Sequence, residues 1–314
     1  MSIIRRRRIK SSDIENIARQ LAPLQRWYGP DFNRNAIRAT VTKLAGENAV
    51  TSLLVERVEP ESNGANERLL GFGFAGFIDL ALARELIDSP PQDDVPGYLY
   101  GLEQRGIRCF LRPEEQGACN AGEGMALLFL HFYTPALTAD GGEAQQVISL
   151  MYDSFRIGHA GNNTRILMQP RPDEDTGLLE SLLAQGYWTA EANPNIVMFD
   201  LDKLKGAPFH PLATIRSSVA PRLGFSYAEK DLLCHALHSR SDEELAQDLN
   251  ISLDTVRKRW RNIYQRISDH PEINLFSDQP LDTDNKTRGR GKRQLVLQYI
   301  QDHLEEIRPY NITK

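Results

Sequence analysis

The sequence predicts an α+β protein in which a mixed α/β part is followed by an all-helical part. Up to residue 204, short apolar runs typical of strands alternate with amphipathic helical patterns. After residue 222, apolar residues recur only at helical spacing. The segment 205–221 holds three prolines and has no clear periodicity. We therefore interpret it as a linker between two domains, 1–204 and 222–314.

Several segments of the first domain have distinct helix or strand patterns. A capping box formed by Ser12 and Glu15 predicts a helix over 11–21. The stretch 38–58 predicts two strands around a Gly-Glu-Asn turn. Further strands are predicted at 68–78, 124–133, 164–169 and 195–201, and further helices at 143–158 and 177–185.

The composition is that of an ordinary globular chain, with 41% hydrophobic and 25% charged residues. Its three cysteines have no C-x-x-C spacing, which argues against a disulfide framework or a zinc site and favours a reducing compartment. The longest apolar run, 125–133, is too short to cross a bilayer, and no apolar signal core follows the four arginines 5–8. We therefore predict a cytoplasmic protein without a membrane partner.

The second domain begins with two short capped helices. Ser226 is the predicted cap of the first helix, and Ser241 with Glu244 forms a capping box at the second. Asn250 lies at the following turn, where a residue that tolerates left-handed backbone angles is needed. Ser252 then caps a third helix. Two short helices joined by a tight turn are the geometry of a DNA-binding helix-turn-helix.

The third helix, 253–267, has one apolar and one polar face. We expect the apolar face to be buried against the first two helices. It consists of Leu253, Val256, Trp260, Ile263 and Ile267. Base contacts are predicted for four side chains that point away from the core, Asp254, Lys258, Arg261 and Gln265, and for Thr255 on their flank. Phosphate contacts are predicted for Ser252, Arg257 and Arg259. The alternative is a solvated amphipathic helix.

The charge distribution favours a nucleic-acid partner. The whole chain has a net charge of −5, but residues 253–293 hold ten basic and six acidic side chains. A nucleic acid responds to this local basicity and not to the charge of the whole chain.

Residues 225–267 resemble the LuxR-type helix-turn-helix without a gap. The resemblance is carried by Phe225, Ser226, Glu229, Ser241, Glu244-Leu245-Ala246, Leu249, Ile251-Ser252, Thr255-Val256-Arg257 and Ile263. It implies a bacterial transcription regulator whose helix 253–267 enters the major groove of double-stranded DNA, and a homodimer formed through a fourth helix. Two features depart from the family pattern: Arg259 stands where histidine is usual, and 268–290 is inserted before the fourth helix.

The start of this displaced fourth helix is strongly basic. We predict it as a second phosphate-binding group, formed by Lys286, Arg288, Arg290, Lys292 and Arg293. A solvated basic loop is the alternative.

The order of strands and helices in 1–204 weakly resembles the GNAT acetyltransferase superfamily. Members of that superfamily bind the pyrophosphate of acyl-CoA on an R/Q-x-x-G-x-G/A turn after the fourth strand. Residues 133–146 stand at this place and lack the pattern, and the near match at 156–161 lies at the wrong end of the next helix. We therefore predict a degenerate relative, without cofactor or catalytic residues, that senses a small-molecule ligand or mediates assembly. The alternative is an acetyl-CoA-dependent N-acetyltransferase with a helical DNA-binding accessory domain.

Two further groups have two interpretations each. Asp231, His235 and His238 share one helix face, which fits a metal site or a wet helix surface; we predict no metal. Arg156 and His159 lie among glycines, which fits either the lining of a ligand pocket or the C-terminus of a helix.

Overall fold

The computed structural model has the α+β architecture predicted from the sequence, with seven strands in one mixed sheet among the described residues. The structure describes residues 3–9, 13, 17, 34–58, 68–91, 94–139, 141–171, 178–204, 206–207, 210–217, 219–238, 241–273, 275–276 and 285–311. Side chains are described for all of these except 3, 34–38, 58, 137–138 and 285–290.

The sheet has the strand order β1-β2-β3-β4-β5-β7-β6. β4 and β5 are parallel, and the other neighbouring strands are antiparallel. Alternate residues of β4 enter different cores: Leu128 packs on one face of the sheet and Leu127 on the other. The strands are β1 (Ile3–Arg7), β2 (Val50–Val58), β3 (Arg68–Ile78), β4 (Met125–Tyr133), β5 (Thr164–Pro170), β6 (Trp188–Thr189) and β7 (Ile196–Asp200).

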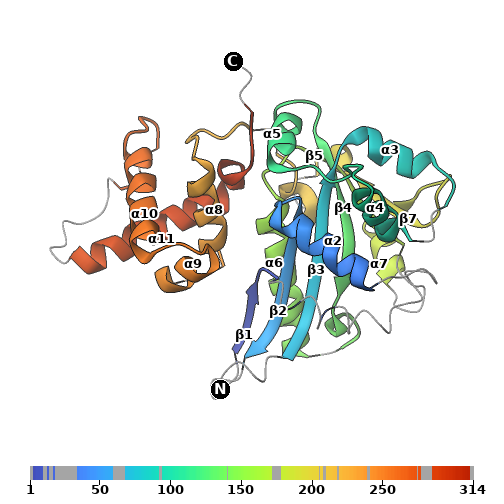
Figure 1. Ribbon diagram of the computed structural model, residues 1–314, viewed down its shortest axis with the longest axis horizontal. Coiled ribbons are helices and arrows are strands. Elements are labelled where there is room, and N and C mark those ends of the chain that lie inside the picture. Colours follow the sequence, from blue (N-terminus) through green and yellow to red (C-terminus); the bar gives the residue numbers. More distant parts are fainter. Residues whose placement is uncertain are drawn as a thin grey trace.

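Helices cover both faces of this sheet (Figure 1). One face packs against α2, α3 and α4 around the fully buried Phe72 and Leu99. The other face packs against α6 and α7 around Leu127 and Leu167. The bounds are α2 (Arg34–Gly46), α3 (Leu80–Asp88), α4 (Val95–Gln104), α5 (Pro113–Ala121), α6 (Gly142–His159) and α7 (Leu178–Ala184), with short 3-10 helices η3 (Pro135–Thr138) and η5 (Leu201–Leu204).

The helices after residue 222 form a second group beside the sheet, on the left in Figure 1. We call residues 222–302 the helical unit and residues 3–204 the sheet unit. One buried apolar cluster runs from the sheet unit through Phe225 to Leu233 and Val296 of the helical unit. No helix in the described part of the chain is long and apolar enough to span a membrane. The helical unit contains α8 (Tyr227–Ala236), α9 (Asp242–Asp248), α10 (Leu253–Ser268) and α11 (Asn285–Asp302).

Residues 210–217 of the segment that we interpreted as a linker are packed on the sheet unit. It contains the 3-10 helix η6 (Pro211–Thr214), and Ile215 is fully buried. The backbone N–H of Ser217 donates to the carbonyl of Asn162 at 2.8 Å. Arg216 pairs with Asp202 at 2.7 Å. This part of 205–221 is therefore held against the sheet unit.

The C-terminal tail, residues 303–311, returns to the sheet unit after α11. It begins with the 3-10 helix η7 (Leu304–Ile307). Near its end, the backbone N–H of Asn311 donates to the carbonyl of Gly117 at 3.0 Å, and Asn120 Nδ2 donates to the carbonyl of Pro309 at 2.7 Å. The helical unit is thus tied to the sheet unit at both of its ends.

The structure corrects one predicted element and adds others. The first half of the stretch 38–58 is part of α2 and not a strand, because its buried residues Thr40, Val41 and Leu44 recur at helical spacing. The predicted turn is present, with Asn48 in the left-handed region at φ 52°. Helices α3, α4 and α5 were not predicted. The predicted helix 11–21, including Ser12 and Glu15, lies outside the described residues except for Asp13 and the buried Ile17.

Candidate nucleic-acid interface and a cavity between the units

The predicted caps of the three helices are confirmed. Ser226 and Ser241 each form a capping box with the glutamate three residues later. The Oγ of Ser252 accepts from the backbone N–H of Thr255 at 3.1 Å. Between α9 and α10, Asn250 has φ 51°, a left-handed conformation that asparagine adopts more readily than most residues. These local interactions set the angle at which α10 follows α9.

The apolar stripe of α10 is buried as predicted. Val256, Ile263 and Ile267 have no exposed surface, Trp260 is 4% exposed and Leu253 is half-buried. The stripe packs into the cluster that also contains α8 and α9. Burial of these side chains determines which face of α10 points outward.

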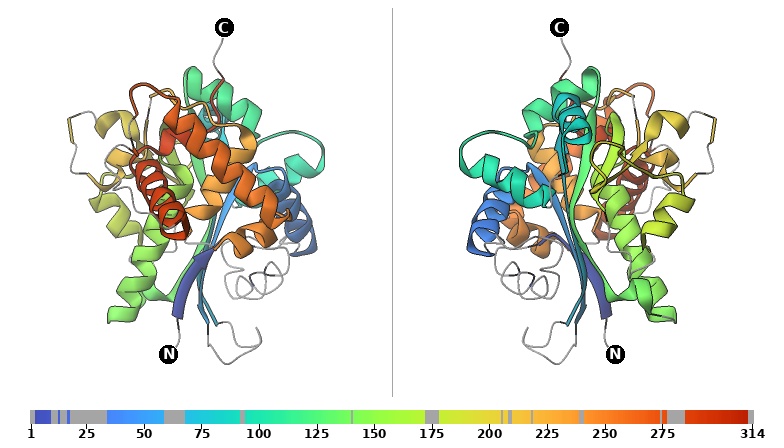
Figure 2. Two further views of the ribbon diagram at one scale, coloured as in Figure 1. Left: turned by 90° about the vertical axis from the view of Figure 1, so that its left-hand side faces the viewer. Right: turned by 90° about the vertical axis from the view of Figure 1, so that its right-hand side faces the viewer.

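The predicted base-contacting residues lie on the outer face of α10. Asp254, Lys258, Arg261 and Gln265 are exposed, whereas Thr255 is half-buried with its hydroxyl bonded to Ser252 at 2.8 Å. The left view of Figure 2 shows α10 in front, on the side of the molecule that faces away from the sheet. A duplex can therefore approach this face without displacing the sheet unit.

The cations that flank this face differ in accessibility. Arg257 is 61% exposed and lies 3.6 Å from Asp254, one turn earlier. Arg259 is half-buried, and its Nη1 is enclosed without a hydrogen-bond partner. Because Arg259 is half-buried with one nitrogen enclosed, whereas Arg257 is exposed, Arg257 is the better placed of the two.

The second predicted basic group is partly occupied by contacts within the helical unit. Arg293 pairs with Asp242 of α9 at 2.6 Å, and its guanidinium lies 5.0 Å from the ring centroid of Trp260. Lys292 lies over the ring of Phe276 at 4.9 Å. The helix α11 begins at residue 285, so this basic segment is helical and not a loop. The side chains of Lys286, Arg288 and Arg290 lie outside the described set.

The other helix of the motif, α9, is acidic. Its first turn carries Asp242, Glu243 and Glu244, and Asp248 follows at its end. These carboxylates repel phosphate, so contacts to a nucleic-acid backbone have to come from the exposed cations of α10 and from α11.

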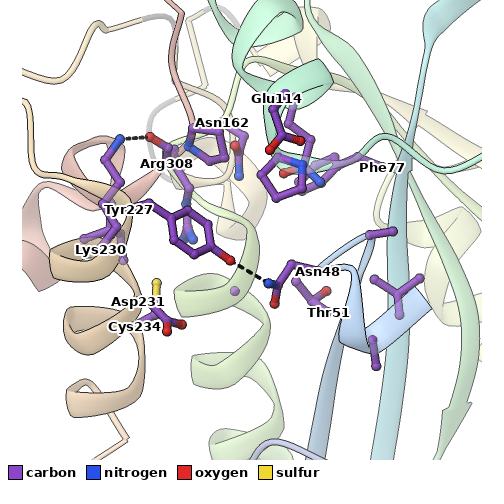
Figure 3. Close-up of a pocket in the computed structure, with 18 of the residues that line it drawn as sticks. Asn48, Thr51, Phe77, Glu114, Asn162, Tyr227, Lys230, Asp231, Cys234 and Arg308 are labelled. Atoms are coloured by element: carbon purple, nitrogen blue, oxygen red, sulfur yellow. Dashed lines mark hydrogen bonds between the residues drawn. The ribbon is translucent and has the colours of Figure 1, made fainter. Parts of the chain in front are cut away.

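A cavity of about 360 Å³ lies between the two units, and Figure 3 shows it. This volume is within the usual range for small-molecule sites. The sheet unit contributes Arg8 and Asn48, α8 contributes Tyr227 and Lys230, and the tail contributes Arg308. Asn48 Nδ2 donates to the hydroxyl of Tyr227 at 2.7 Å and so joins the units beside the cavity. We call this space the interface cavity.

The helix face of Asp231 and His235 also meets the sheet unit and not open solvent. Asp231 lines the interface cavity, and burial raises the pKa of its carboxyl. His235 Nε2 lies 3.7 Å from Asp231 and 3.4 Å from Arg8 Nη1. His238 lines a smaller adjoining cavity of about 130 Å³. Among the described residues, no cluster of three potential metal ligands is found.

The glycine-rich segment around His159 fits both interpretations of the sequence. It ends α6, with Gly161 in the left-handed region at φ 84°. It also reaches the interface cavity through Gly158. His159 itself is buried and lies 2.5 Å from the hydroxyl of Thr51, and burial lowers the pKa of its imidazole to about 3. Arg156 donates to the carbonyl of Gln301 at 3.1 Å and is a contact between the units.

Comparisons with known proteins do not place the chain in a family. No family model and no curated protein matches it. Among solved structures, the chain is similar to the crystal structure of a mutant of KacT, with 9% sequence identity and a TM-score of 0.31. That match covers 65% of this chain and 98% of KacT. A likeness at this level carries no argument about function.

Proposed function

We propose that the protein is a sequence-specific DNA-binding transcription regulator, in which α10 reads the major groove and the sheet unit serves as a ligand sensor or assembly module. The observation that carries the proposal is the outer face of α10. Its exposed Arg257, Lys258 and Arg261 lie beside the exposed polar side chains Asp254 and Gln265. The buried stripe holds this face away from the sheet unit.

The arrangement separates two kinds of contact. Lys258 and Arg261 project from the middle of the outer face, where side chains reach base edges. Arg257 flanks them and Ser252 caps the helix start, where free backbone amides favour a phosphate. Recognition by a homodimer remains part of the proposal, since two half-sites would double the contacts that one short helix can make.

The test is DNA binding by the full-length chain, first on random-sequence duplex with a salt titration and then on selected sites. We expect affinity to fall steeply with salt. Arg257→Ala should reduce the salt slope by about 1 and weaken all sequences alike. Lys258→Ala and Arg261→Ala should each cost about 1–3 kcal/mol on a selected site and relax its specificity.

Arg84→Ala is the matched control, because Arg84 is an exposed cation on α3 of the sheet unit. It should leave both DNA affinity and salt slope unchanged. If the three α10 variants bind DNA like the wild type, or if the wild type shows no salt-dependent binding, α10 has only a solvated polar face.

The alternative is an acetyl-CoA-dependent N-acetyltransferase. In its favour, α6 follows β4 in the place where that chemistry would hold a pyrophosphate. Against it, the first turn of α6 carries Glu143, which pairs with Arg57. The carboxylate of Glu143 places a negative charge at the start of α6, where the pyrophosphate would have to bind. A saturable rise in melting temperature with acetyl-CoA, together with acetyl transfer to an amine, would favour this alternative.

A further inference from the structure

Three cationic side chains meet at the interface cavity from three parts of the chain. Arg8 follows β1, Lys230 lies on α8, and Arg308 belongs to the C-terminal tail. The cavity also has two acidic residues in its lining, Glu114 and Asp231, but Glu114 is exposed to solvent. The interior of the cavity therefore has an excess of positive charge.

Arg308 is the most deeply buried of the three, with 7% of its surface exposed. Its Nε donates to the carbonyl of Ala160 at 2.6 Å and its Nη2 donates to the carbonyl of Ile157, both at the C-terminal end of α6. The partial negative charge of a helix end favours a cation there. No carboxylate among the described residues lies within 4.0 Å of this guanidinium. Burial lowers the pKa of Arg308 to about 10.

The other two cations also lack a carboxylate partner within 4.0 Å among the described residues. Lys230 Nζ donates to the backbone carbonyl of Arg308 at 2.5 Å, and Arg8 contacts the imidazole of His235. An ammonium has three N–H donors and a guanidinium has five, so each side chain has donors beyond the bonds described. Buried charges in proteins are generally paired.

The neutral polar groups of the cavity are largely occupied by one another. Asn48 donates to Tyr227, and Asn162 donates to the carbonyl of His159 and accepts from Asn120. What the cavity offers a ligand is thus mainly cationic N–H donors. These select an acceptor with negative charge.

We propose that the interface cavity is the binding site of a small anion, a carboxylate or a phosphate compound, held between Arg8, Lys230 and Arg308. Because these residues come from both units and the tail, the bound anion would bridge the sheet unit and the helical unit. Occupancy then stabilises the docked arrangement of the two units. Any effect of the anion on DNA affinity rests on the proposed function; anion binding itself does not.

The experiment is calorimetric titration of the full-length chain with inorganic phosphate and, separately, with succinate. Ionic strength is held constant with sodium chloride. We expect saturable binding of at least one probe, together with a rise in melting temperature. The probe that binds distinguishes a phosphate from a carboxylate ligand. Arg8→Gln and Lys230→Gln should each weaken binding about ten- to a hundredfold, since each removes hydrogen bonds to a charged group.

Arg84→Gln serves as the control and should bind the anion like the wild type, because Arg84 lies on α3 and does not line the cavity. Lys258→Ala should also bind the anion normally even where it loses DNA. A failure of the anion site can therefore be distinguished from a failure of the proposed DNA-binding function. If neither probe shows saturable binding, or if Arg8→Gln and Lys230→Gln bind like the wild type, Arg308 serves only to cap α6 and the proposal is wrong.

Discussion

Arg112 and Arg308 are both buried, but their guanidinium groups have different partners. Arg112 makes five side-chain hydrogen bonds, four to the carboxylates of Glu47 and Glu103 and one to the carbonyl of Phe110. The two hydrogen bonds described for the Arg308 side chain are both to backbone carbonyls. One guanidinium is paired directly with carboxylates, and the other is not.

Arg7 and Arg8 show the same contrast at adjacent positions of the sequence. Arg7 lies on β1 and bonds to Asp13 and to Glu56 of β2, with its Nε 2.8 Å from Glu56. Arg8 lines the interface cavity and has no carboxylate within 4.0 Å among the described residues. We call an arginine compensated when carboxylates bond to its guanidinium, and uncompensated when no carboxylate lies within 4.0 Å of it. We infer that compensated arginines hold the sheet unit together, whereas the uncompensated ones provide N–H donors for a ligand.

The largest effect is expected when the Arg112 cluster loses Glu103, the buried one of its two acids. Glu103→Ala leaves the guanidinium of Arg112 buried beside an empty space and removes the acceptor of the Cys109 and Phe110 backbone amides. We expect the free energy of unfolding in urea to fall by about 3–5 kcal/mol. Glu85→Ala, at an exposed position of α3, should change it by less than about 0.5 kcal/mol. Equal losses in the two variants would contradict a special role for the cluster.

The same clusters should make the protein sensitive to acid. Burial alone raises the pKa of Glu103 and Glu56. Hydrogen bonds and charge attraction, from Arg112 and two backbone amides at Glu103 and from Arg7 and Arg5 at Glu56, together outweigh burial and hold both pKa values below the usual range. Their stabilisation is complete above the unfolded pKa of about 4.3 and is lost as pH falls through the lower folded values. Urea unfolding between pH 7 and pH 3 should show this loss, and Glu103→Gln should flatten the profile. An unchanged profile would refute the assignment.

A smaller effect is expected at the uncompensated arginine. Arg308→Met keeps the apolar stem and removes both the bonds to α6 and the unpaired buried charge. Loss of the two hydrogen bonds destabilises the fold, whereas removal of a buried charge without a carboxylate partner stabilises it. Because the two changes partly cancel, we expect a fall of about 1–2 kcal/mol in the free energy of unfolding. A fall in the free energy of unfolding as large as that of Glu103→Ala would mean that a negatively charged partner stabilises Arg308 after all.

The sequence predicted the helical unit better than the sheet unit because its signals are local. Caps at Ser226, Ser241 and Ser252, and the left-handed Asn250, depend on residues within four positions of one another. The stripe of α10 repeats over four turns, so its buried face follows from spacing alone.

The failures have physical causes as well. Residues 38–46 contain β-branched side chains, which favoured a strand, yet tertiary burial of Val41 and Leu44 stabilises a helix there. The interface cavity could not be predicted, because Arg8, Lys230 and Arg308 are far apart in the chain and meet only when the tail returns to α6. Their lack of carboxylate partners has no signature in the sequence.

The smallest effect is expected for a compensated pair that is not buried. Arg222 and Glu272 lie 2.5 Å apart, with 45% and 73% of their side chains exposed. Water screens this attraction and ordering two long side chains costs entropy, so Glu272→Gln should lower the free energy of unfolding by no more than about 1 kcal/mol, and less in high salt. Urea unfolding at two salt concentrations measures it. Suppose that Glu272→Gln lowered the free energy of unfolding as much as Glu103→Ala does. Having an acidic partner would then matter more for stability than the burial of that partner. The contrast between Arg112 and Arg308 would in that case come from pairing alone.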